Sequence, residues 1–442
     1  MTPFSFLTLF LFTLNTAPLS TMTAVVEAKI PIDSLENDSI ILIKSIDLAH
    51  REKDDLKKIG ERIGDRKIVL LGEQSHGDGS AFQLKARLIK YLHEEMGFDV
   101  LLFEADFFSV NEVMAHYDKT TDLKGLLDNN IYPFWIKTPV MAPLWSYVQQ
   151  TFATPNPLYI GGVDSRHIGN YAFDHLTKDL DAFLAKKAAA LLEEERYLNF
   201  KKNLLELLEG ENQSTHLHDN LTRKNFFEVL EELSTVSHTT QDAFWTQELL
   251  NIKRFATDIW VPSFFPERNK MMAENVIWLL QHRFKNQKVI IWSHNQHILK
   301  DRTIEIDLLK QFDPGADQLK TNPLFTEMGE RIANQYPDQV YAIGFLSYGG
   351  AHSPFENMVI HPQSADLSEF RQRIPIAPPS EQSLEKRLLS YEEDYLFLDL
   401  HQKKQTDFAT KALKNHHPRG EFSTQWGKAY DAFFFIREMR GL

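Results

Sequence analysis

The chain has 442 residues, with 48 lysines and arginines against 61 aspartates and glutamates, a formal net charge of -13, and 43% hydrophobic residues. This composition is typical of a globular protein and excludes disordered and fibrous classes. The acidic balance argues against a nucleic-acid partner and against docking on anionic lipid. Because cysteine is absent, thiol nucleophiles, cysteine-bound metal centres and disulfides are excluded. Any chemistry must use carboxylates, histidines, hydroxyls or a bound ion.

The first residues predict export. Phe4 to Leu14 is an apolar run with the length of a signal-peptide core, and it is too short to cross a bilayer as a helix. Small residues follow it, although only the terminal amine supplies positive charge before it. We expect residues 1–24 to be a signal peptide and the protein to be secreted or periplasmic. The alternative is a loosely packed apolar tail. We expect no membrane anchor, since no other segment is apolar enough to span a bilayer.

Short apolar runs rich in branched residues predict buried strands. Their near-continuous apolarity is typical of strands covered on both faces, which favours an α/β fold with a mostly parallel sheet flanked by helices. A helix-like stretch from Asp78 to Met96, with Gly97 at its end, separates the first two runs and predicts a βαβ unit. The runs are Lys67 to Gly72, Val100 to Glu104, Leu158 to Val163, Lys288 to Trp292 and Val340 to Phe345, with two further candidates at Tyr395 to Leu400 and Ala432 to Ile436.

A long segment without proline interrupts the alternation of strands and helices. Between Tyr171 and Trp260 the only glycine is Gly210, and the stretch is dense in leucine, alanine, glutamate and lysine. Apolar stripes at helical spacing predict helices over 182–209, 221–233 and 242–255. We therefore expect residues 30–170 and 261–442 to form two parts of one α/β core, with an all-helical insertion at 171–260. Five prolines between Ser353 and Ser380 predict a long surface loop.

Acidic residues and histidines follow four of the predicted strands. In a parallel sheet the carboxyl ends of the strands lie along one edge, and ligands bind at that edge. A cap or a surface ion pair would explain any one of these residues alone, but four such ends together predict a functional site. The polar groups concerned are Glu73 and His76, Glu104 and Asp106, Asp164, and His294 and His297.

The standard catalytic motifs are missing. Ser75 lacks the glycine-framed turn of a serine hydrolase, because Glu73 stands where a glycine is required. The chain also lacks a phosphate loop, a dinucleotide-binding turn and a His-Glu-x-x-His zinc motif. Histidine with carboxylate remains. This pair is suited to activating water as a general base, and two histidines with one carboxylate could instead bind a divalent ion.

Three blocks resemble the signature of the erythromycin esterase family. They are Gly72 to Gly77 (GEQSHG), Arg268 to Asn275 (RNKMMAEN) and Trp292 to His297 (WSHNQH), in the family's order and at plausible spacing. The resemblance covers most of Ile68 to Gly350, with the helical segment looser and the last ninety residues vaguer. It implies hydrolysis of a cyclic ester, a macrolactone, without a metal, a cofactor or a covalent intermediate.

The resemblance also implies roles for individual residues. His76 corresponds to the histidine that acts as general base on water. Glu73 and Glu104 match acidic positions that would orient the imidazole or hold the water. His294 would face the ester, where it would stabilise the developing oxyanion or protonate the leaving alcohol.

Three further positions are expected to contact substrate, namely His297, Lys85 and Arg268. His297 would support His294, although it could equally cap the following helix. Arg268 would be a polarising cation or would only pair with a core acid. Asp164 and Asp106 are expected to be turn or supporting residues.

Two departures from the family pattern point away from a macrolide substrate and from antibiotic resistance. Lys85 stands where macrolide esterases carry an arginine, so the charge is kept but the planar two-pronged donor is lost. The family's Arg-Asp pair is Arg268-Asn269 here, which removes one carboxylate. Neither change disables a histidine-activated water. The expected partner is therefore a small-molecule ester or lactone.

Two alternatives remain open at this level. The first is a metallohydrolase that uses Glu73, His76, Glu104 and His294 around one ion. The second is a ligand-binding protein of the haem or iron type, because distant relatives with a similar Gly-Glu-x-His turn bind such ligands. A second histidine cluster on an opposing strand end favours chemistry over storage.

Overall fold

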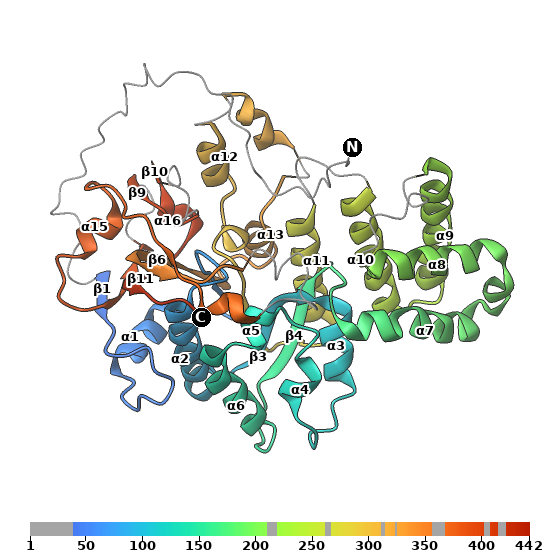
Figure 1. Ribbon diagram of the computed structural model, residues 1–442, viewed down its shortest axis with the longest axis horizontal. Coiled ribbons are helices and arrows are strands. Elements are labelled where there is room, and N and C mark those ends of the chain that lie inside the picture. The colour runs from blue at the N-terminus through green and yellow to red at the C-terminus, as the bar shows by residue number, and fades with distance from the viewer. Residues whose placement is uncertain are drawn as a thin grey trace.

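The computed structural model describes residues 39–209, 219–260, 267–310, 314–322, 325–355, 367–401, 407–413 and 421–442. In this part of the chain, nine strands form one sheet in the order β1-β8-β11-β6-β2-β5-β3-β4, with β7 paired to β6 (Figure 1). The strands of this sheet are β1 (Ile40–Leu42), β2 (Ile68–Leu71), β3 (Phe98–Asp106), β4 (Tyr159–Asp164), β5 (Lys288–Trp292), β6 (Val340–His352), β7 (Ile374–Pro375), β8 (Tyr395–Asp399) and β11 (Ala432–Met439). A separate two-stranded sheet pairs β9 (Phe408–Thr410) with β10 (Phe422–Thr424).

The predicted α/β class is confirmed, and each predicted apolar run coincides with a strand. The sheet is mixed. From β4 to β11 neighbouring strands are parallel, whereas β8 runs antiparallel to β11 and β1 runs antiparallel to β8. Apolar composition predicts that a strand is buried but not which way it runs, so this antiparallel edge was not foreseen.

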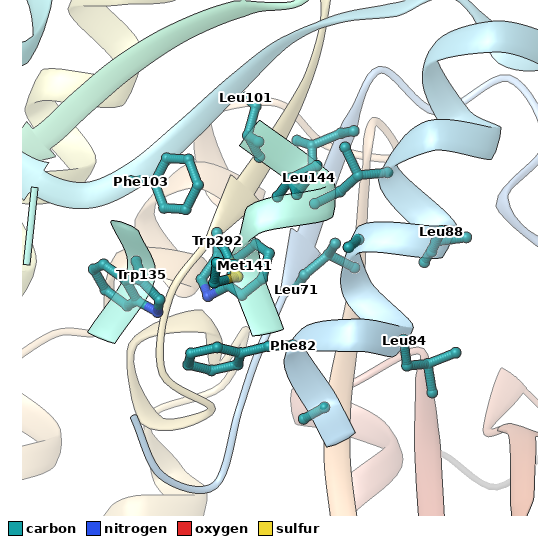
Figure 2. Packing of buried hydrophobic residues seen from close by; sticks show 14 of the residues in the cluster. Leu71, Phe82, Leu84, Leu88, Leu101, Phe103, Trp135, Met141, Leu144 and Trp292 are labelled. Atoms are coloured by element: carbon teal, nitrogen blue, oxygen red, sulfur yellow. The ribbon is translucent and has the colours of Figure 1, made fainter. Parts of the chain in front are cut away.

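Successive residues of the central strands face two different cores. On β2, Val69 and Leu71 join one hydrophobic cluster, while Ile68 and Leu70 join the other. Figure 2 shows the first cluster, in which Leu71 and Trp292 pack beside the helix that carries Phe82 and Leu88. Both faces are therefore covered, which is why the strands lack the alternation of a half-exposed sheet.

Helices cover the two faces of the sheet. The helix predicted after β2 is α2 (Gly79–Met96), and Gly97 ends it in the left-handed conformation at φ 70°, as expected for a residue without a side chain. The other helices outside the 171–260 segment are α1 (Asp54–Ile63), α3 (Phe107–Ala115), α4 (Leu123–Leu127), α5 (Pro133–Ile136), α6 (Ala142–Thr151), α11 (Arg268–His282), α12 (Thr303–Lys310), α13 (Met328–Gln335), α15 (Leu384–Leu388) and α16 (Trp426–Ala429). Short 3-10 helices are η3 (Pro139–Met141), η6 (Gln296–Ile298), η7 (Pro314–Thr321) and η8 (Leu367–Arg371).

The segment predicted to be all-helical forms an arm at one side of the molecule (Figure 1). It consists of α7 (Asn170–Lys187), η4 (Ala189–Glu193), α8 (Glu195–Leu208), α9 (Asn220–Thr239) and α10 (Ala243–Trp260), with its own apolar cluster. The single helix predicted over 182–209 is wrong, because α7 ends at Lys187 and α8 starts at Glu195. Leu184 and Phe200 thereby pack into the same cluster, so tertiary packing overrides high local helix propensity.

The long surface loop predicted between Ser353 and Ser380 is wrong at its first described end, whereas residues 371–375 are exposed as predicted. Ser353 is completely buried, and the Ile374–Pro375 strand pairs with the end of β6. The prolines are exposed at Pro375 and Pro378, whereas Pro379 is buried. The proposed signal peptide lies outside the described residues. Among the residues that are described, no helix is both long and apolar enough to cross a membrane.

Candidate active site

The turn between β2 and α2 places Glu73 and His76 at the carboxyl edge of the sheet. Asp78 accepts a hydrogen bond from the Ser75 backbone N–H (3.0 Å), and the Ser75 hydroxyl accepts one from the Gly77 N–H (3.1 Å). A Cβ at Gly77 would lie 1.8 Å from the Ser353 carbonyl oxygen, so only glycine fits against the end of β6. Ser75 is completely buried and serves this turn.

Glu73 is a fully buried carboxylate with four donors. It accepts hydrogen bonds from His76 Nδ1 (2.7 Å), Lys85 Nζ (2.5 Å), Trp292 Nε1 (2.8 Å) and Trp135 Nε1 (3.3 Å). Burial by itself would raise the pKa of Glu73, but the Lys85 charge and the His76 contact outweigh it and lower the pKa. The carboxylate therefore stays ionised and fixes the orientation of the imidazole.

Lys85 bonds to Glu73 and is not exposed to solvent. Its side chain is 0% exposed, and its ammonium lies 4.3 Å from the centre of the Trp292 ring. Burial lowers the pKa of Lys85 to about 8, with the Glu73 charge opposing that fall. The expected contact between Lys85 and substrate is thus replaced by a contact with Glu73. The spacing of Lys85 along α2 could not show that the side chain points beneath the turn.

One ring nitrogen of His76, Nδ1, is hydrogen-bonded to Glu73, and the other, Nε2, is available to a ligand. Because Nδ1 donates to the Glu73 carboxylate, the neutral ring has its lone pair on Nε2, and Nε2 has no hydrogen-bond partner among the described residues. The ring stacks on Phe134 (centroids 4.8 Å apart, planes at 3°) and meets Phe355 edge-on at 5.1 Å. The side chain is 12% exposed. An oriented imidazole with a free lone pair and apolar walls is the arrangement expected of a general base.

A second cluster joins the ends of β3 and β4 to the start of α11. Arg268 donates to Asp164 Oδ1 through Nε (3.0 Å) and to Asp164 Oδ2 through Nη2 (2.6 Å), and Nη2 also donates to Glu104 Oε1 (2.7 Å). The other Glu104 oxygen accepts from the Ser293 hydroxyl (2.6 Å). His297 Nε2 lies 3.2 Å from Glu104 Oε1.

In this second cluster, ion pairing opposes the effect of burial on the charged groups. Burial opposes ionisation of Glu104, but His297 and Arg268 hold the pKa of its carboxyl well below the usual range. Burial disfavours the Arg268 cation, yet Asp164 and Glu104 raise the pKa of the guanidinium well above its ordinary value. Arg268 therefore pairs with two core acids, which was the structural alternative for this residue. Asp164 is its main partner.

His294 lies between the two clusters and has no open nitrogen. Its Nε2 lies 2.9 Å from the Gln74 carbonyl oxygen, and its Nδ1 accepts from the Gln296 N–H (3.1 Å). Burial, followed by the charges of His76 and His297, lowers the pKa of His294 to about 3. The ring centres of His294 and His76 are 5.6 Å apart. His294 is thus a neutral imidazole that ties the His76 turn to the end of β5.

The sequence model of the erythromycin esterase family matches residues 93–439. The chain belongs to the erythromycin esterase family. The matched residues include Glu104, Arg268, His294 and His297, whereas the turn with His76 precedes them.

Two curated relatives of this erythromycin esterase family member are hydrolases by name. YbfO of Bacillus subtilis (strain 168), assigned provisionally as a hydrolase, is 27% identical over 381 residues, which are 81% of this chain and 80% of that protein. Erythromycin esterase type II of Escherichia coli is 23% identical over 360 residues, 76% of this chain and 81% of that protein. Together with the family match, these relatives support a hydrolase.

A solved structure supports the same fold. The erythromycin esterase EreC, crystallised as a histidine mutant in its open conformation, superposes with a TM-score of 0.64 at 14% identity. The alignment covers 91% of this chain and 98% of that one. At this identity the likeness concerns the fold alone.

Asp106 has a structural role in this family member. It caps α3 by accepting from the Ser109 N–H (2.9 Å) and the Ser109 hydroxyl (2.7 Å), and it also accepts from the Gly169 N–H (2.9 Å). Burial raises its pKa, and the charge of His167 and these donors oppose the rise. Asp106 is therefore a turn residue, as the sequence suggested.

The described residues contain no group of three or more histidine, aspartate or glutamate side chains arranged to hold a metal ion. Hydrogen bonds to other protein groups occupy the carboxylate oxygens that a metal ion would need. Both Glu73 oxygens accept from nitrogen donors, and the Glu104 oxygens face Arg268 and Ser293. Of the four residues of the metallohydrolase alternative, Glu73 and His76 thus belong to one cluster, Glu104 belongs to the other, and His294 lies between them.

The aromatic wall of the site was not foreseen. Tyr132, Phe134 and Trp135 come from the segment before and within α5, and their rings lie against one another. Trp135 donates a hydrogen bond to Glu73, and the Phe134 ring stacks on the His76 ring. The dense aromatic run around Pro133 is visible in the sequence. Because it follows no strand, its position beside the strand ends could not be predicted.

Proposed function

We propose that this protein hydrolyses a carboxylic ester or lactone with a water molecule activated by His76, and that no covalent intermediate forms. The observation that supports the proposal is the Glu73–His76 pair, in which Nδ1 is held at 2.7 Å and Nε2 is open. Erythromycin esterase type II is named for an ester substrate, which supports the same reaction class here. The buried position of Ser75 argues against a serine nucleophile.

The proposed reaction proceeds in two proton-balanced steps. His76 Nε2 removes a proton from water while the hydroxyl oxygen bonds to the ester carbonyl carbon, and Glu73 stabilises the resulting imidazolium. The tetrahedral intermediate then expels the alkoxide, which takes the proton back from His76. Lys85 keeps Glu73 ionised throughout. His294 holds the turn in place, because both of its nitrogens already bind backbone groups.

The substrate is proposed to differ from a macrolide. Lys85 and Asn269 replace an arginine and an aspartate of the macrolide-esterase pattern. Lys85 belongs to the Glu73 cluster, and Asn269 follows Arg268 of the second cluster in the chain. Asn269 donates to Glu327 (2.6 Å), which fixes its amide. A small ester or lactone with a bulky apolar part fits the aromatic wall formed by Phe134 and Phe355.

The first test is hydrolysis of a panel of lactones and aryl esters by the wild type and by His76→Ala, each with and without chelator. We expect turnover that survives chelator and falls by a factor of about 100 to 10,000 in His76→Ala. His116→Ala, on the exposed end of α3, is the matched control. Loss of activity to chelator with recovery on adding a divalent ion would instead support a metallohydrolase. Labelling of Ser75 by a phosphonate with loss of activity would contradict the water mechanism.

We also propose that the protein is exported, on the basis of the apolar run from Phe4 to Leu14. The measurement is expression of the full chain followed by fractionation and N-terminal sequencing. A mature N-terminus near residue 24 in the exported fraction is expected. A cytoplasmic protein that retains Met1 would contradict the proposal.

A further inference from the structure

The polar residues of the site follow the order of the strands across the sheet. His76 lies after β2, His294 and His297 after β5, Glu104 at the end of β3, and Asp164 at the end of β4, while the sheet order is β2-β5-β3-β4. Arg166 stands two residues beyond β4 and continues this row. Since neighbouring strands are separated by about 4.8 Å, three strands place Arg166 on the order of 14 Å from His76.

Arg166 differs from the other cations of this region in lacking a carboxylate partner. Lys85 is bonded to Glu73, and Arg268 is bonded to Asp164 and Glu104. Arg254 is bonded to Asp258 and Glu267. Arg166 is a half-buried residue, and its side chain makes no ion pair with the described residues. A guanidinium without a counter-charge in such a position is ready to bind an anion.

A buried hydroxyl lies beside this guanidinium. Tyr132 is 2% exposed, and its hydroxyl makes no hydrogen bond of normal geometry with the described residues. Burial raises the pKa of Tyr132, and the charge of Arg166 is the largest influence against that rise. The Tyr132 ring stacks on Phe134 (5.3 Å, 8°), and Phe134 stacks on His76. One continuous aromatic stack therefore joins the His76 imidazole to the Tyr132 side chain.

We propose that Arg166, with the Tyr132 hydroxyl, forms a subsite for a carboxylate carried by the substrate, three strands away from the ester that His76 attacks. This inference rests on the proposed esterase function and adds a substrate class to it, namely esters whose acyl or alcohol part ends in a carboxylate. The planar guanidinium fits a carboxylate through two parallel hydrogen bonds, and the tyrosine supplies a third donor. The apolar rings between the two ends would contact the chain that connects ester and carboxylate.

The acidic residues near Arg166 pair with other arginines, so Arg166 is available to an anion from a ligand. Asp164 is held by Arg268 through both of its oxygens. Asp258 is near enough to feel the charge of Arg166, but its direct partner is Arg254. Arg166 can therefore accept a ligand carboxylate without breaking an existing ion pair.

The test compares two series of 4-nitrophenyl esters of equal chain length. One series carries linear acyl chains that end in a methyl group, and the other carries chains that end in a carboxylate. We expect the carboxylate to raise kcat/KM by roughly tenfold or more, through KM, once the chain is long enough to reach Arg166. Arg166→Gln should abolish this preference and leave the methyl series unchanged, while Arg166→Lys should keep part of it. Arg196→Gln, on α8 in the helical arm, is the charge-matched control.

A binding measurement separates this inference from the esterase proposal. The probe is the amide analogue of the carboxylate-ended ester with the longest acyl chain of the series, titrated by calorimetry into the wild type, Arg166→Gln and Tyr132→Phe. Binding that weakens about tenfold in Arg166→Gln and less in Tyr132→Phe is expected, even if no ester is hydrolysed. Equal hydrolysis of both ester series with equal binding by wild type and Arg166→Gln would overturn the subsite and leave the esterase intact. Anion-dependent binding without any turnover would overturn the esterase and leave the subsite intact.

Discussion

Both halves of the site combine a buried glutamate with a histidine and a cation, but they differ in which hydrogen-bonding groups lack a partner. Around Glu73, one lysine, two indole groups and His76 satisfy the carboxylate, and the far nitrogen of His76 stays open. Around Glu104, the donors and acceptors bind one another, and Arg268 is shared between two acids. Reactivity is therefore expected at the first half and rigidity at the second. A count of histidines and acids at strand ends cannot separate these roles.

The largest effect on stability is expected from breaking the second half. Arg268→Gln removes the guanidinium that the buried Glu104 and Asp164 share, so we expect a loss of about 3–5 kcal/mol in the free energy of unfolding. Chemical denaturation at pH 7 measures this loss, with the exposed Arg196→Gln as a control that should change little. A loss below 1 kcal/mol would mean that the cluster is solvated and not a rigid support.

His294 should reveal its bridging role through the pH dependence of stability. Its pKa of about 3 lies below the 6.5 of an unfolded histidine, so between these values the unfolded chain binds a proton that the folded chain does not. The stability contributed by neutral His294 is present above pH 6.5 and is lost as the pH falls toward 3, by at most about 1.4 kcal/mol per pH unit. His294→Gln should therefore lose stability less steeply between pH 6.5 and 4. Parallel curves for both proteins would contradict the neutral, buried imidazole.

Deprotonation of Lys85 should lower kcat/KM at alkaline pH. With a pKa of about 8, the ammonium that keeps Glu73 ionised is present below pH 8 and is lost above it, so kcat/KM should fall several-fold between pH 8 and 9.5. Lys85→Arg keeps its charge throughout this range and should remove this fall. The measurement is a pH profile of kcat/KM for both proteins on one ester. An unchanged fall in Lys85→Arg would assign it to another group.

The smallest effect is expected beside the second half, at Asn269. Its amide donates to Glu327, whose pKa burial and the charge of Glu305 raise well above the ordinary value. Asn269→Asp would add a third acid there, and we expect a loss of about 1 kcal/mol at pH 8 that disappears near pH 5, where the new carboxyl can share a proton. Denaturation at the two pH values measures it. Equal losses at both would indicate a packing effect and not a charge effect.

The sequence predicted the strands and the residues of the site better than their contacts. Buried strands have a composition of their own, and their carboxyl ends share an edge, so Glu73, His76, Glu104 and His294 could be grouped without coordinates. The burial of Lys85 depends on which face of α2 packs against Trp292, a tertiary fact that its spacing does not encode.

Three further features of the structure could not be predicted from the sequence. The aromatic wall comes from a segment that follows no strand, and the antiparallel edge formed by β8 has the same composition as a parallel strand. The break between α7 and α8 occurs in a run of good helix formers, where packing of Leu184 and Phe200 decides the outcome. In each case the missing information is a contact between residues far apart in the chain.

The most direct test of the central claim is chemical rescue of His76→Gly by imidazole during hydrolysis of the best ester, in the presence of chelator. If the open Nε2 of His76 activates water, the variant should be inactive alone, and added imidazole should restore turnover in proportion to the concentration of its neutral form. Wild-type activity should be indifferent to both additions. Full activity of His76→Gly without imidazole would show that another group activates the water, and the account of this site would be wrong.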